Sequence, residues 1–152
     1  MRRILVAAPL AAALVLASAA AASTPVVPVF TQRQIAKRAP ALAYVPARLA
    51  IGFRYRNWKL GGGVLRIWFA SRTEPRKTIV FAAAPFHGSC RAGMERSFQM
   101  AGVKTWYSHT SSRQEAWRCA NGMKLTASTT MQPRRFADVG LARIAASGHR
   151  VR

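Results

Sequence analysis

The stretch at residues 115–129, EAWRCANGMKLTAST, decides the fold expected for this chain. Two short runs of apolar, aromatic and β-branched residues flank the pair Asn121-Gly122. An Asn-Gly pair between two such runs is the strongest short-range signal for a β-hairpin, because both residues tolerate the positive φ angles of a tight turn. We therefore predict strands at residues 115–120 and 123–129.

Further strand-like runs precede this hairpin. Residues 96–100 and 103–109 predict a second hairpin about Ala101-Gly102. A strand is expected from residue 51 to the glycines at 61–63, and another at 78–83, with turn residues between the runs. The run at 64–70, VLRIWFA, is almost entirely apolar and is therefore expected to be a central strand.

The last segment has a helical period instead. Apolar residues recur at helical spacing from about residue 134 to 147, and Gly148 follows where a C-terminal cap is expected. A helix after a run of antiparallel strands predicts the α+β class. We expect an antiparallel, curved β-sheet of about six to seven strands, with the C-terminal helix packed on one face.

Cys90 and Cys119 are the two cysteines of the chain. They form no C-x-x-C motif, and with His87 and His109 they do not show the ligand spacing of a metal site. An even, minimal count in an exported protein predicts one disulfide, which would tie down the loop at residues 85–94. We expect no metal, no cofactor and no nucleophilic cysteine.

The N-terminal residues predict export. Arg2 and Arg3 precede an apolar segment and a run of small residues at 17–23, which is the pattern of a cleavable signal peptide at residues 1–22. Export would deliver the chain to the periplasm or the outside of the cell, and a retained N-terminal membrane anchor is the alternative. Residues 23–48, with four prolines, predict an exposed, extended leader, with a short helical turn around residues 32–38, before a single α+β domain at 49–152.

The charge is extreme. The chain has 24 lysines and arginines against 4 acidic residues, a net charge of +20, and removing the signal leaves +18. Such a balance favours polyanionic partners. An anionic envelope polymer or a lipid surface is our favoured partner, with nucleic acid and an unidentified protein as alternatives. A compositional bias would also account for basic residues spread along the whole chain. The candidate anion contacts are Arg54, Arg56, Lys59, Arg66, Arg134 and Arg135.

Aromatic and basic residues alternate in two strands, at residues 53–59 (FRYRNWK) and 104–107 (KTWY). On an exposed face such aromatics would stack on bases or sugars beside bound phosphates. The favoured prediction instead points them into the core beneath the helix and the arginines to water. The tryptophans expected in the core or at its rim are Trp58, Trp68, Trp106 and Trp117.

Catalysis is the competing class of function. A small secreted ribonuclease-like hydrolase needs a general acid, a general base and cations for the phosphate. His109 with Glu95 or Glu115 would supply the first two, and Arg113 and Arg118 the cations. Their spacing is typical of no known active site, so a non-enzymatic binding protein is favoured. Glu74 and Asp138 fit ordinary roles in a turn and at a helix N-terminus.

Two short motifs resemble a family of bacterial exported domains of unknown function. Residues 49–55, LAIGFRY, are similar to the family's opening L-P-x-G-Y, with Ala50 in place of the usual proline. Residues 141–147, LARIAAS, are similar to its closing helix. Members occur alone and in the extracellular parts of envelope-stress and sporulation proteins. The resemblance, over about residues 45–150, implies an α+β domain and carries no catalytic residue to this chain.

Overall fold

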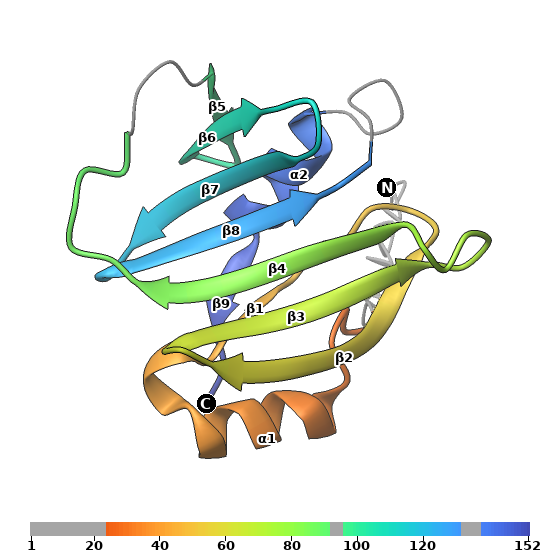
Figure 1. Ribbon diagram of the computed structural model, residues 1–152. Coiled ribbons are helices and arrows are strands. Elements are labelled where there is room, and N and C mark those ends of the chain that lie inside the picture. Colours follow the sequence, from red (N-terminus) through yellow and green to blue (C-terminus); the bar gives the residue numbers. More distant parts are fainter. Residues whose placement is uncertain (1–23, 92–95, 132–137) are drawn as a thin grey trace, which may run out of the picture.

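The computed structural model describes residues 24–91, 96–131 and 138–152. The first elements are a helix, a short 3-10 turn and a short strand (Figure 1). Eight further strands and one more helix follow them. The elements are α1 (Val29–Arg38), η1 (Pro40–Leu42), β1 (Tyr44–Pro46), β2 (Phe53–Gly61), β3 (Val64–Ser71), β4 (Thr78–Pro85), β5 (Arg96–Met100), β6 (Val103–His109), β7 (Gln114–Ala120), β8 (Met123–Thr129), α2 (Asp138–Ala146) and β9 (Gly148–Arg150).

Seven of the strands form one antiparallel sheet in the order β2-β3-β4-β8-β7-β6-β5. β1 and β9 pair separately as a two-stranded antiparallel sheet. Both predicted hairpins are confirmed, with positive φ at Ala101, Gly102, Asn121 and Gly122. The predicted α+β class, with a seven-stranded sheet and a C-terminal helix packed against it, is confirmed as well.

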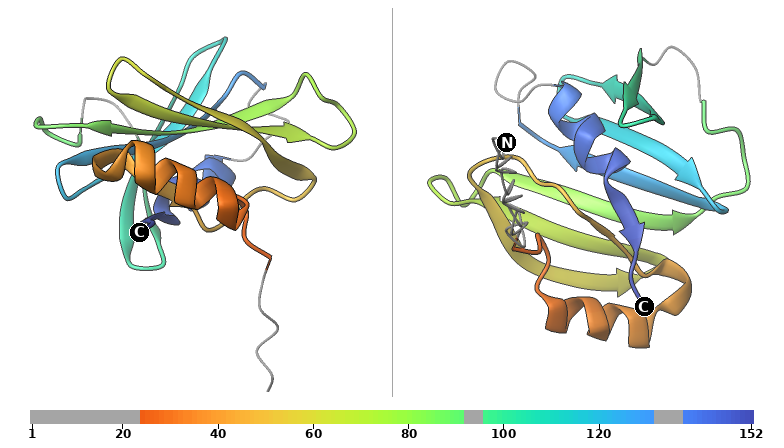
Figure 2. Two further views of the ribbon diagram at one scale, coloured as in Figure 1. Left: turned by 90° about the horizontal axis from the view of Figure 1, so that it is seen from below. Right: turned by 180° about the vertical axis from the view of Figure 1, so that it is seen from behind.

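The two faces of the large sheet have different surroundings. α2, β1 and β9 lie behind the sheet in Figure 1, and Figure 2 shows the same elements from behind. We call this side the covered face. Its core consists of large aliphatic and aromatic side chains, with α2 packed on β6, β7 and β8. The largest fully buried members are Phe69, Phe81, Ile35, Leu65, Ile67, Ile79, Leu125, Leu141 and Ile144.

The opposite side is the open face, over which no helix of the described residues lies (Figures 1 and 2). Side chains alternate between the two faces along each strand, so the register assigns each residue to one of them. In β3 the residues Leu65, Ile67 and Phe69 are fully buried, whereas Arg66 is exposed and Trp68 half-buried. Arg66 and Trp68 therefore belong to the open face.

The prediction of an exposed, extended leader at residues 23–48 is wrong. This segment contains the ten-residue helix α1, and its residues Val27, Ile35 and Val45 are buried in the core. The prolines lie at the boundaries of elements rather than inside them: Pro28 precedes α1 and Pro46 ends β1. Proline is compatible with these positions, because no helix or ladder hydrogen bond is lost there.

The predicted disulfide is confirmed between Cys90 and Cys119, whose Cα atoms are 5.8 Å apart across 29 residues. A disulfide indicates an oxidising compartment outside the cytoplasm. None of the helices in the described residues has the length and apolar composition needed to cross a bilayer. The predicted signal peptide at 1–22 lies outside the described residues.

Candidate anion-binding site

Four arginines from separate segments line one open pocket of about 820 Å³. Arg48 follows β1, Arg54 is in β2, Arg72 follows β3 and Arg143 is in the last turn of α2. We call this the arginine pocket. The remaining lining comes from residues 24–26 and from residues in the segment 47–55. All four arginines are exposed to solvent, so their guanidinium groups are available to a ligand.

Backbone hydrogen bonds hold the segments that carry these arginines. The amide of Arg72 donates to the carbonyl of Gly52 at 2.8 Å, which joins the end of β3 to the turn before β2. Gly52 has φ +85°, a conformation that glycine adopts without strain. The amide of Arg48 donates to Ser147 Oγ at 3.0 Å, and Ser147 Oγ donates to the carbonyl of Ile144 at 2.8 Å. Arg48 is thereby tied to the end of α2.

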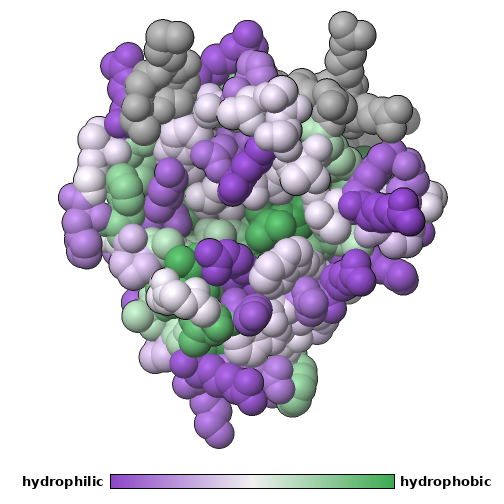
Figure 3. Space-filling model, viewed as in Figure 1, coloured by the Kyte–Doolittle hydropathy of each residue, from purple (hydrophilic) through white to green (hydrophobic). Residues whose placement is uncertain are grey.

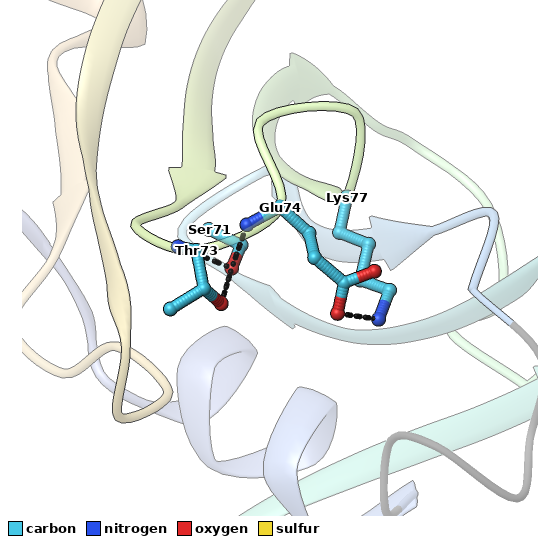
Figure 4. Close-up of polar contacts among 4 residues, drawn as sticks. All are labelled: Ser71, Thr73, Glu74 and Lys77. Atoms are coloured by element: carbon cyan, nitrogen blue, oxygen red, sulfur yellow. Dashed lines mark hydrogen bonds and ion pairs between the residues drawn. The ribbon is translucent and has the colours of Figure 1, made fainter.

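In the turn that follows Arg72, the carboxylate of Glu74 is neutralised by a lysine of the same turn. Ser71 Oγ accepts hydrogen bonds from the amides of Thr73 and Glu74 at 3.3 and 3.2 Å (Figure 4). The Glu74 carboxylate forms an ion pair with Lys77 across the turn (Figure 4). Glu74 thus has the ordinary role in a turn expected from the sequence. No carboxylate is among the described residues that line the arginine pocket.

The walls of the arginine pocket are partly apolar. Val26, Leu49, Phe53 and Tyr55 are half-buried or lie against the core cluster, and they line the pocket together with the arginines. At the rim, Ile51 is fully exposed, with 102 % relative accessibility. Guanidinium groups bind carboxylate and phosphate through paired N–H donors. The arrangement therefore suits an anionic group that is joined to an apolar portion.

A second, smaller hollow of about 400 Å³ lies further along β2. Its lining includes Arg56, Lys59 and Trp68 together with Asn57, Trp58 and Thr78. We call it the tryptophan pocket. The register of β2 against β3 shifts between Tyr55 and Asn57, so Arg56 is the extra residue of a β-bulge. The bulge separates Arg54, in the arginine pocket, from Arg56 and Lys59.

The structure therefore divides the predicted anion contacts instead of gathering them. Arg54 lines the arginine pocket, whereas Arg56 and Lys59 line the tryptophan pocket. Arg66 is exposed on β3 and donates to the carbonyl of Gly61 at 3.4 Å. Arg134 and Arg135 lie outside the described residues. Arg48, Arg72 and Arg143 were not among the predicted contacts, because they share no local motif and line one pocket only through the tertiary fold.

The tryptophans are half-buried, except Trp117, which is 2 % exposed. Trp58 pairs with Ile67 and thus faces the covered side, where the Arg38 guanidinium lies 5.9 Å from its ring centroid. Trp68, Trp106 and Trp117 belong to the open face. This burial agrees with the core or rim positions expected for the tryptophans. The expectation that the aromatics of residues 53–59 and 104–107 point beneath the helix is wrong for Trp106, because neighbouring residues of a strand alternate between the two faces.

The residues considered for a ribonuclease-like site are not brought together. His109 follows Tyr107 on the covered side and stacks on its ring at 5.9 Å, whereas Glu115 is on the open face and pairs with Arg113 at 3.2 Å. Arg118 donates to the carbonyl of Gly148, and burial lowers the pKa of its guanidinium. Glu95 lies outside the described residues.

A search for related proteins adds no identification. No protein-family model, no curated protein and no solved structure matches the chain. The resemblance of residues 49–55 and 141–147 to exported domains remains an expectation.

Proposed function

We propose that this protein is a non-catalytic binding protein of the extracytoplasmic space, whose arginine pocket takes a negatively charged component of the cell envelope. The observation that carries the proposal is the convergence of Arg48, Arg54, Arg72 and Arg143 on one pocket without a lining carboxylate. The four guanidinium groups are exposed and no lining carboxylate neutralises them, so an anion that binds there gains favourable electrostatic interactions. The disulfide supports an oxidising compartment, where such envelope components are found.

The apolar part of the pocket favours an anionic lipid headgroup over a purely polar polymer. Leu49 and Phe53 would contact the first carbons attached to the headgroup, and the exposed Ile51 would enter the interfacial layer of a membrane. Removing exposed apolar surface from water contributes about 25 cal/mol per Å². Charge and apolar burial would thus act together, as in other peripheral membrane contacts.

Vesicle binding tests the proposal. The oxidised full chain is sedimented with phosphatidylglycerol–phosphatidylcholine vesicles at about 0.15 M salt, where distant surface charges are screened. We expect Arg54→Gln/Arg72→Gln to weaken binding about tenfold, because each lost charge-assisted contact is worth more than a neutral hydrogen bond.

The control is Arg76→Gln/Arg152→Gln, which removes the same charge from exposed positions that do not line the pocket. A loss below about twofold is expected for it, because unpaired surface charges contribute little. Equal losses for the two double variants would show that net charge alone drives binding and would overturn the role of the pocket. A parallel titration with heparin distinguishes an anionic polymer from a lipid as the ligand.

A further inference from the structure

The open face carries a continuous row of side chains across the whole sheet. Each residue of this row is the register partner of the next one on the adjacent strand. In strand order the row is Lys59, Arg66, Ala82, Thr126, Trp117, Trp106 and Ser97. Two cations thus stand at one side, small residues in the middle and two indoles at the other side.

The adjacent row has the same form. Trp68 pairs with Val80, which pairs with Ser128, which in turn pairs with Glu115. The central strands β4 and β8 therefore present small side chains, with indole rings on both sides of them. Trp68 on β3 and Trp106 on β6 are four strand spacings apart, or about 19 Å. Figure 3 views this face, on which hydrophilic side chains lie at the margin and also between the hydrophobic ones in the middle.

Cations accompany the indole rings. Lys124 Nζ lies 4.6 Å from the Trp117 ring centroid and 5.8 Å from that of Phe86, and Lys104 Nζ lies 4.8 Å from that of Trp106. At the other side, Arg56 and Lys59 line the tryptophan pocket with Trp68. Glu115 is the one carboxylate of the described residues placed on this face, and it pairs with Arg113 at 3.2 Å. The open face is thus an uncompensated cationic surface.

We propose that the open face is a second binding surface, for an anionic polysaccharide that lies across the strands and seats one sugar ring against Trp68. A chain molecule is needed, because the two half-buried indoles are too far apart for one small ligand to reach both. Asn57 and Thr78 in the tryptophan pocket and Thr126 on the floor supply hydrogen-bonding groups for sugar hydroxyls. Arg56, Lys59 and Lys124 would pair with the acid groups of the polymer.

Single-stranded nucleic acid fits the same surface less well. It carries a phosphate at every nucleotide and binds through several exposed aromatic platforms along a charged groove. Here Trp117 is 2 % exposed, with its Nε1 donating to the Cys90 carbonyl at 2.8 Å, so it offers no platform. An oxidising compartment also favours an envelope glycan.

This surface is separate from the arginine pocket. The tryptophan pocket and the arginine pocket have no lining residue in common, and the bulge at Arg56 lies between them. A polysaccharide site on the open face therefore does not depend on whether the arginine pocket binds an anion. Arg76, which is exposed and lines neither pocket, supplies the charge-matched control.

The experiment is a fluorescence titration of the oxidised full chain with polygalacturonate at about 0.15 M salt. We expect Trp68→Leu to weaken binding about tenfold, because it removes the aromatic face against which the sugar ring packs. Trp68→Phe, which keeps an aromatic face, should retain most of the affinity. Lys59→Gln should also weaken binding, and Arg76→Gln, which removes one charge from an exposed position that lines neither pocket, should change it by less than about twofold.

Several results would overturn the inference. Unchanged affinity in Trp68→Leu would exclude the site, and equal losses in Lys59→Gln and Arg76→Gln would show that net charge alone drives binding. Binding of uncharged dextran as tight as that of polygalacturonate would contradict the anionic requirement. Tighter binding of oligo(dT) than of polygalacturonate would replace the glycan by a nucleic acid. Circular dichroism of each variant checks that the sheet is intact.

Discussion

The covered and open faces belong to the same seven strands, yet they have opposite chemistry. In β3, Leu65, Ile67 and Phe69 are fully buried, while the intervening Arg66 and Trp68 remain accessible. Because side chains alternate between the two faces, neighbouring residues of one strand can have different roles. The covered face supplies the burial that stabilises the fold. The open face does not have to supply this buried apolar surface. It can therefore carry cations and partly exposed aromatic rings, which a core would exclude.

The largest effect expected from this contrast is in β4. Phe81 is fully buried on the covered face, and its neighbour Val80 is half-buried on the open face. We expect Phe81→Ala to lower the free energy of unfolding by about 3–5 kcal/mol, because it removes buried contacts and leaves a cavity. Val80→Ala should cost less than about 1 kcal/mol. Urea unfolding followed by tryptophan fluorescence measures both, and similar losses would contradict the division of the sheet into two faces.

The disulfide is expected to have a similar but smaller effect. It closes a loop of 29 residues and links the segment after β4 to β7. In the chain-entropy model, losing this link lowers the free energy of unfolding by about 3–4 kcal/mol. Urea unfolding with and without a reducing agent gives the value. Cys90→Ser/Cys119→Ser should reproduce the loss and abolish any further response to reduction, and a wild-type chain indifferent to reduction would refute the estimate.

A backbone contact on the covered face provides the third test. A Cβ added to Gly148 would lie 2.9 Å from Leu125 Cδ1 and 2.9 Å from Phe81 Cζ. We expect Gly148→Ala to cost about 1–3 kcal/mol through overpacking. Gly61→Ala is the matched control, because a Cβ there meets nothing within 4 Å. Chemical unfolding of the two variants compares them, and a loss at Gly61 as large as that at Gly148 would show that packing is not the cause.

Much of the sheet is predictable because its signals are local. The Asn121-Gly122 and Ala101-Gly102 turns predict both C-terminal hairpins, and the apolar run at residues 64–70 predicts a strand that has a neighbour on each side, although β3 is second from the edge and not central. The pairing of Cys90 with Cys119 needed only their count. The hairpins and the strand depend on residues close together in the sequence, and two cysteines can form only one intramolecular disulfide.

The features that escaped prediction are non-local. β1 and β9 are three residues each and pair across about a hundred positions, so neither run is recognisable as a strand on its own. The bulge at Arg56 breaks the alternation of β2, so that Arg54 and Arg56 line different pockets. Arg48, Arg72 and Arg143 gather only once α2 has packed on the sheet. No local sequence pattern predicts contacts between residues that are so far apart in the chain.

The β1–β9 pair has a consequence for the order of events during synthesis. Tyr44 is opposite Arg150, and the amide of Val151 donates to the carbonyl of Ala43 at 2.8 Å. A ribosome releases residue 44 long before residue 150, so the early strand must wait unpaired while some hundred later residues emerge. The two-stranded sheet can therefore form only after the last residues of the chain have been synthesised.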